Sequence, residues 1–156
     1  MMAWKDLRPI VKERLEGVSG MGEVNDFIRH TRFWTDFLKR HVKDQKVHTW
    51  EFTRVSMEEE FEVLGEETVV GNLFRDTHEI LVIGRMSLSL SGETEGPFQD
   101  VVDDVIAAFR ADTLLGGRLI VPAPPRVDSV GHTSYGGVLV HEARVTILAS
   151  ERVSPA

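Results

Sequence analysis

The sequence predicts an α+β domain: an antiparallel or mixed sheet of about four to five strands, with helices packed on one face. Three observations predict it. Apolar residues recur at helical spacing near the N-terminus and again after residue 97. Polar and apolar residues alternate in the segments between and after these helices. Consecutive strands also follow one another without a helical crossover, which is typical of antiparallel pairing.

The composition is that of one globular domain. The chain has 156 residues, of which 42% are hydrophobic and 28% charged, and it has no cysteine. We expect a single domain over residues 1–156, with residues 150–156 as a flexible tail. The net charge of −7 disfavours general affinity for polyanions. The apolar runs are too short to cross a bilayer, and the N-terminus does not resemble a signal peptide, so no membrane partner is expected.

A first helix is predicted where Trp4, Leu7, Val11 and Leu15 recur at helical spacing. Because Pro9 suits a first turn, its regular part is expected to start near Asp6 or Leu7.

A second helix is predicted over "DFIRHTRFWTDFLKRH" (residues 26–41), which interleaves aromatic and basic side chains. Single-stranded nucleic-acid platforms combine the same residue types. The rings share one helical face, however, and the local excess of about two positive charges is small for a polyanion site. We therefore expect Trp34 and Phe37 to pack against protein and not against bases.

The strands begin with a segment in which His48, Trp50 and Phe52 alternate with polar residues, a half-buried strand of about eight residues. Residues 56–76 are acidic and show no clear period, so they are interpreted as a connection, with a short strand of its own as the alternative. Residues 77–92 form the strongest predicted strand. Residues 97–110 then predict an amphipathic helix, because Pro97 suits a first helical position and apolar residues follow at helical spacing. A hairpin over residues 126–149 closes the chain.

The sequence shows no catalytic constellation. Its six histidines form no i,i+4 pair, and "GVSGMG" matches neither a nucleophile elbow nor a phosphate loop. Around Glu58 the acidic residues are so dense that they indicate a solvated segment, whereas a catalytic dyad needs two carboxyl groups in different environments. We therefore expect no enzyme activity, no metal and no organic cofactor. His141 lies on the apolar side of its strand, which favours a hydrogen-bonded core or interface residue over a metal ligand.

The order of elements resembles that of the tail terminator (tail completion) proteins of long-tailed bacteriophages. The resemblance rests on three features: the opening helix "DLRPIVKERLEG" with the turn "GEVNDF", the strands "HTWEFTR" and "THEILVIGRMSL", and the acidic helix "PFQDVVDDVIAAFR" before a closing hairpin. It covers most of the chain.

The resemblance implies a homo-oligomeric ring, usually a hexamer, at the tail-neck junction of a virion assembled in the host cytoplasm. Such a ring would cap the major tail tube protein, stop tube elongation and meet a head-completion (neck) protein. Double-stranded DNA would pass through it without specific binding. Two alternatives remain open: a neck or head-tail connector protein on the portal side, and a small ligand-binding domain or enzyme.

Two sets of residues are candidates for this role. The first set is an acidic loop that would face the lumen of the ring, where like charge opposes the adhesion of DNA. Its members are Glu58, Glu59, Glu60, Glu62, Glu66 and Glu67. The alternative is that these residues only keep the protein soluble. The closing hairpin would form the subunit interface, through Arg126, Tyr135, His141 and Arg144.

Overall fold

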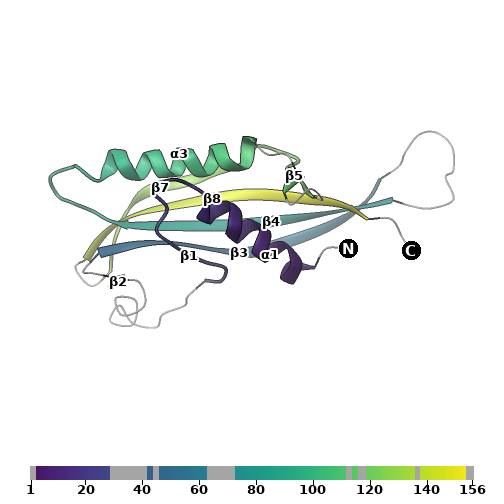
Figure 1. Cartoon of the computed structure of the whole chain (residues 1–156), viewed down its shortest axis with the longest axis horizontal. Coiled ribbons are helices and arrows are strands. Elements are labelled where there is room, and N and C mark those ends of the chain that lie inside the picture. Colours follow the sequence, from purple (N-terminus) through teal and green to yellow (C-terminus); the bar gives the residue numbers. More distant parts are fainter. Residues whose placement is uncertain are drawn as a thin grey trace.

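The computed structural model of the protein describes residues 3–28, 42–43, 46–62, 73–111, 114–115, 119–135 and 138–153. These residues form an α+β fold built on one curled, mixed sheet (Figure 1). Its elements are α1 (Trp4–Glu16), β1 (Glu23–Asn25), β2 (Val42–Lys43), β3 (Lys46–Glu62), β4 (Leu73–Ser87), α3 (Glu95–Ala111), β5 (Leu114–Leu115), β6 (Leu119–Ile120), β7 (Arg126–Tyr135) and β8 (Val138–Val153). The predicted fold class is confirmed.

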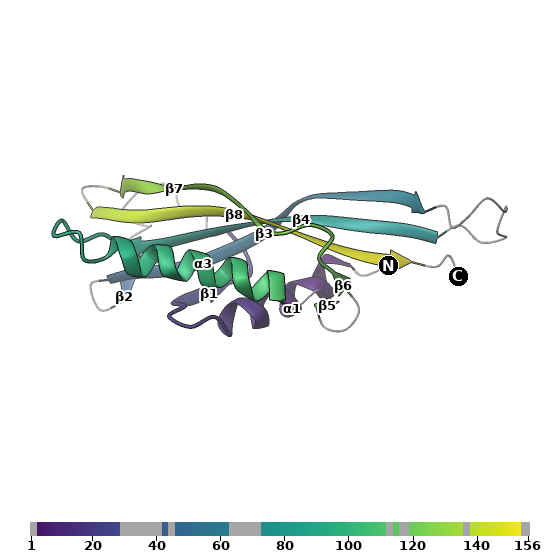
Figure 2. The ribbon, with the colours of Figure 1, turned by 90° about the horizontal axis from the view of Figure 1, so that it is seen from above.

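Three long strands, β3, β4 and β8, form the frame of the sheet. The strand order is β1-β3-β4-β8-β6-β5, with β7 also pairing with β8 and β2 with β3. β1 runs parallel to β3, whereas the long strands pair in antiparallel fashion. Figure 2 shows the long strands crossing one another near the middle of the molecule, as expected for a strongly twisted sheet. β3, β4 and β8 continue beyond both helices toward one end (Figure 1).

One hydrophobic core joins both helices to the sheet. Leu7, Val11 and Leu15 of α1 are buried in it together with the apolar stripe of α3. Directly paired residues of antiparallel strands point to the same side of a sheet, so we call the side that bears these apolar residues the core face. The core residues contributed by the three long strands are Trp50, Phe52, Ile80, Val82, Ala143, Val145, Ile147 and Ala149.

Trp50 and Gly84 meet at the centre of the core face. They lie directly opposite each other on β3 and β4. A Cβ atom added at Gly84 would stand 2.5 Å from the indole ring of Trp50, so only glycine leaves room for this ring. On its other side the ring approaches Phe98 of α3, with 6.2 Å between centroids. The glycine therefore allows a large aromatic side chain to lie close to the sheet.

The acidic connection predicted over residues 56–76 is wrong for the described part of that range, all of which belongs to the long strands β3 and β4. β3 continues through Glu58, Glu59, Glu60 and Glu62, so these four residues lie on a strand and not in a loop. β4 begins at Leu73. Residues 55–60 are exposed on both faces, which removes the alternation by which a half-buried strand is recognised. Glu66 and Glu67 lie outside the described residues.

Other element boundaries differ less from the prediction. α1 begins at Trp4, with Pro9 inside the helix, because its buried face and the packing of Trp4 against Phe52 extend the helix toward the N-terminus. The hairpin of β7 and β8 is confirmed, but β8 runs to Val153. The expected tail is therefore wrong for residues 150–153. Of the predicted second helix, residues 29–41, with Trp34 and Phe37, lie outside the described residues.

Candidate functional site

The β7–β8 hairpin presents an outer strand edge with exposed basic residues. Among the described residues, β7 pairs with β8 and with no other strand. Arg126 is exposed and lies 2.6 Å from Asp128, which also accepts a hydrogen bond from Thr146. These contacts, that from Thr146 foremost, lower the pKa of the Asp128 carboxyl. The side chain of Arg144 is 46% exposed.

His141 is placed differently from the rest of the predicted interface set. Its Nε2 lies 2.8 Å from the hydroxyl of Thr94, and its ring stacks on Phe98 at 5.2 Å between centroids. Burial lowers the pKa of its imidazole. His141 was expected to be a hydrogen-bonded core or interface residue, and in the single chain it is buried beside Thr94 and Phe98. Its assignment to a subunit interface stays a prediction. Tyr135 belongs to β7, and the position of its side chain lies outside the description.

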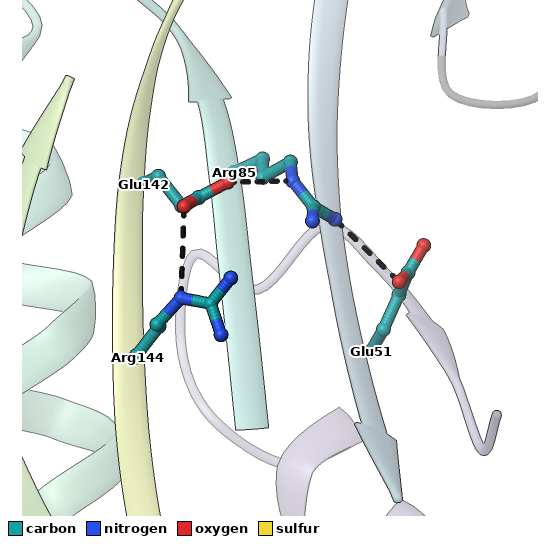
Figure 3. A network of polar contacts seen from close by, with 4 residues as sticks. All are labelled: Glu51, Arg85, Glu142 and Arg144. Carbon is teal, nitrogen blue, oxygen red and sulfur yellow. Dashed lines mark hydrogen bonds and ion pairs between the residues drawn. The ribbon is translucent and has the colours of Figure 1, made fainter. Parts of the chain in front are cut away.

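A charge network crosses the three long strands on the face opposite the core (Figure 3). The guanidinium of Arg85 lies 3.5 Å from the carboxylate of Glu51 and 3.1 Å from that of Glu142. Glu142 in turn lies 3.8 Å from Arg144. The side chain of Glu51 is 0% exposed and that of Arg85 only 11%, so the network runs from a buried carboxylate to an exposed arginine. Sequence reasoning missed it, because Glu51 occupies a polar position of an alternating strand and nothing local signals its burial.

A row of three carboxyl groups crosses the same strands on the core face. Glu59 of β3 lies opposite Asp76 of β4, which lies opposite Glu151 of β8. We call these three residues the carboxyl row. Asp76 is 0% exposed and Glu151 is buried, whereas Glu59 is exposed. No N–H or hydroxyl group in the described part of the chain donates to Asp76.

Within the carboxyl row, Glu59 and Asp76 form a hydrogen bond only when one of them is protonated. That bond is the main cause of a raised pKa for the Glu59 carboxyl, and desolvation and repulsion from Asp76 raise it further. His78 lies two residues along β4, with its Nδ1 3.4 Å from the guanidinium of Arg54. Its pKa is lowered, first by burial and then by the charge of Arg54. The row therefore places three carboxyl groups side by side, and the neighbouring Asp76 favours the protonated form of Glu59.

The carboxyl row leads to a pH-dependent prediction. Below the ordinary carboxyl pKa of 4.5, Glu59 is protonated in both the folded and the unfolded chain. As the pH rises through the window between 4.5 and the raised folded pKa, the unfolded chain loses its proton first, so stability falls. Glu59→Gln should therefore raise Tm at neutral pH and leave it nearly unchanged in acid. Thermal unfolding of both proteins across this range measures the difference, and a constant difference at every pH would contradict the prediction.

The outer edge of β3 is open over its exposed part. β2 pairs with Lys46 and Val47, and β1 pairs with residues 49–51. Over residues 53–62, no strand among the described residues pairs with the side of β3 that faces away from β4. We call this segment the β3 edge. Two apolar side chains are exposed on it, Val55 at 51% and Met57 at 40%.

A groove between the two helices is a further candidate site on the described surface. This groove of about 420 Å³ between α1 and α3 is lined by Ile10, Glu13, Arg14, Gly17 and Ala108, which do not form a nucleophile–base set. Within the described residues, no group of three or more histidines and acids is arranged to hold a metal ion. No helix of that part of the chain has the length and apolar character needed to span a membrane.

Neither a protein-family model nor a curated protein matches this chain. Function is therefore inferred from the surfaces described above and from the order of elements along the sequence.

Proposed function

We propose that the protein is a tail terminator of a long-tailed bacteriophage, a structural protein that forms a ring on the end of the tail tube. The observation that carries the proposal is the outer edge of β7, which no strand within the described ranges covers, with the exposed side chains of Arg126 and Arg144 near it. A strand edge with free backbone groups is a ready surface for another polypeptide. A ring subunit requires a sheet that presents such an edge to its neighbour. The order of elements described above supports the same role.

A ring forms when one patch of a subunit meets a different patch of its neighbour and the rotation closes. The β7–β8 hairpin supplies one patch in this proposal. In the tail terminator role, the ring binds the major tail tube protein on one side and a head-completion protein on the other. DNA passes through without specific binding, which agrees with the net charge of −7.

Separating the parts of an assembling phage tests the role. A tail terminator should co-purify with tails that lack heads, whereas a head-tail connector on the portal side should co-purify with heads that lack tails. Immunogold labelling of the whole particle should place the protein at the neck in several copies. Labelling elsewhere, or a single copy per particle, would overturn the proposal.

The contact between copies can be tested on the purified protein and on the assembled neck. Arg126→Ala combined with Arg144→Ala should weaken self-association by about tenfold, which corresponds to about 1.4 kcal/mol. The matched control combines Lys5→Ala with Arg110→Ala, which removes two exposed positive charges from the helices. Native mass spectrometry and the occupancy of the ring in images measure both variants. Equal behaviour of the two variants would remove the hairpin from the interface.

A further inference from the structure

We infer that the β3 edge is a docking strand for an extended segment of a partner protein that carries basic residues at alternate positions. This inference concerns a different surface from the β7–β8 hairpin and does not depend on the role in a phage tail. It is argued from the backbone of the edge, its exposed side chains and the carboxyl row behind it.

The backbone supplies the first argument. Residues 53–62 of β3 pair with β4 on one side, while on the other side no strand in the described ranges covers them. A strand in this position directs alternate N–H and C=O groups outward, and an added strand satisfies them. Figure 1 shows that β3, β4 and β8 continue past both helices here, so neither helix lies along the outer part of this segment.

The exposed side chains supply the second argument. Val55 and Met57 offer apolar contacts at the inner part of the edge. Beyond them, Glu58 and Glu60 lie opposite Thr77 and Arg75 on the face away from the core, and Glu59 lies on the core face. Side chains on neighbouring strands stand roughly 4.5–5.5 Å apart when they are directly opposite. Basic residues at alternate positions of an added strand would therefore meet Glu58 and Glu60 on the same face.

The carboxyl row supplies the third argument. An added strand would extend the row by one position, beside Glu59. Because side chains alternate between faces, a lysine or arginine stands there only when the added strand is shifted by one residue from the register that faces Glu58 and Glu60. In that shifted register it places a cation next to Glu59 and toward Asp76, which is fully buried and receives no hydrogen bond from an N–H or hydroxyl group of the described residues. A buried carboxylate is stabilised by a nearby positive charge. The cation would offset the repulsion between the neighbouring carboxyl groups of Glu59 and Asp76.

The same features exclude a second copy of the edge as the occupant. Two β3 edges placed side by side would bring the glutamates of residues 58–60 against one another, and like charges on facing strands are destabilising. The β-bulge between Arg54 and Ser56 also interrupts the register that a long self-pairing would need. Acidic side chains and a bulge protect an edge from self-association, yet they leave it open to a strand of opposite charge.

A synthetic peptide of alternating threonine and lysine is the probe for this site. It should bind the full-length protein and protect the backbone amides of residues 53–62 from hydrogen exchange. A peptide of alternating threonine and glutamate should bind at least about tenfold more weakly. The lysine peptide with N-methyl groups along its pairing edge keeps its charge but loses its backbone donors. Equal binding of the methylated peptide, or protection confined to other segments, would overturn the inference.

A charge swap makes the test specific. Glu58→Lys combined with Glu60→Lys should lose the lysine peptide and gain the glutamate peptide. The control, Asp103→Lys with Asp104→Lys on the exposed side of α3, changes the net charge equally and should keep the original preference. If both variants switch preference, the effect is general electrostatics and the inference fails. The alanine substitutions at Arg126 and Arg144 should leave peptide affinity unchanged, so failure of the ring proposal and failure of this inference are distinguishable.

Discussion

Gly84→Ala should destabilise the protein by about 1–3 kcal/mol, the usual cost of overpacking a filled core. The methyl group would stand 2.5 Å from the ring of Trp50, well inside van der Waals contact. Trp50 is fully buried and approaches Phe98 on its other side, so the ring has little room to retreat. The substitution should therefore strain β3, β4 and α3 together.

Urea denaturation with an unchanged m-value measures this loss. Gly131→Ala in β7 is the matched control, because a Cβ atom there meets nothing within 4 Å, and its effect should stay within about 0.5 kcal/mol. In a Trp50→Leu background the added methyl group has more space, so Gly84→Ala should cost less than in the wild type. The same cost in both backgrounds would show that the indole ring is not the cause.

The parts of the fold that the sequence predicts are those set by local patterns. The helix that contains Pro97 and Phe98 is confirmed, because a suitable N-terminal residue and apolar residues at helical spacing coincide there. The closing hairpin is confirmed for a similar reason, since polar and apolar residues alternate over a short stretch of sequence. The long outer half of β3 was not predicted, because a strand exposed on both faces carries no alternation.

The sites depend instead on which distant strands become neighbours. Glu59, Asp76 and Glu151 look like ordinary surface acids in the sequence, and only the register of β3, β4 and β8 puts them in one row. His141 was correctly limited to a core or interface role by its place on an apolar face. Its polar contact could not be predicted, because it depends on the position of Thr94, which lies 47 residues away. Sequence periodicity cannot predict such a contact, because the contact depends on how a helix returns to the sheet.

Arg85→Met should destabilise the protein by about 3–5 kcal/mol, as expected when one partner of a buried ion pair is removed. Arg85 stands between the carboxylates of Glu51 and Glu142, and the side chain of Glu51 is fully buried. Without the guanidinium, the buried carboxylate loses a nearby cation that offsets its desolvation. Arg144→Met is the control at the exposed end of the same network, and an exposed pair contributes only about 0–1 kcal/mol.

A second substitution separates charge from packing. Glu51→Met in the Arg85→Met background removes the buried charge as well, and replacing both partners of a buried pair with apolar residues is often neutral. The double variant should therefore be more stable than Arg85→Met alone, although it differs further from the wild type. Chemical denaturation of the wild type, Arg85→Met, Glu51→Met and the double variant gives the coupling energy between Arg85 and Glu51 directly. If the double variant is the least stable of the four, the long aliphatic part of Arg85 matters more than its charge. The network would then serve to fill space between the strands and not to pair charge across them.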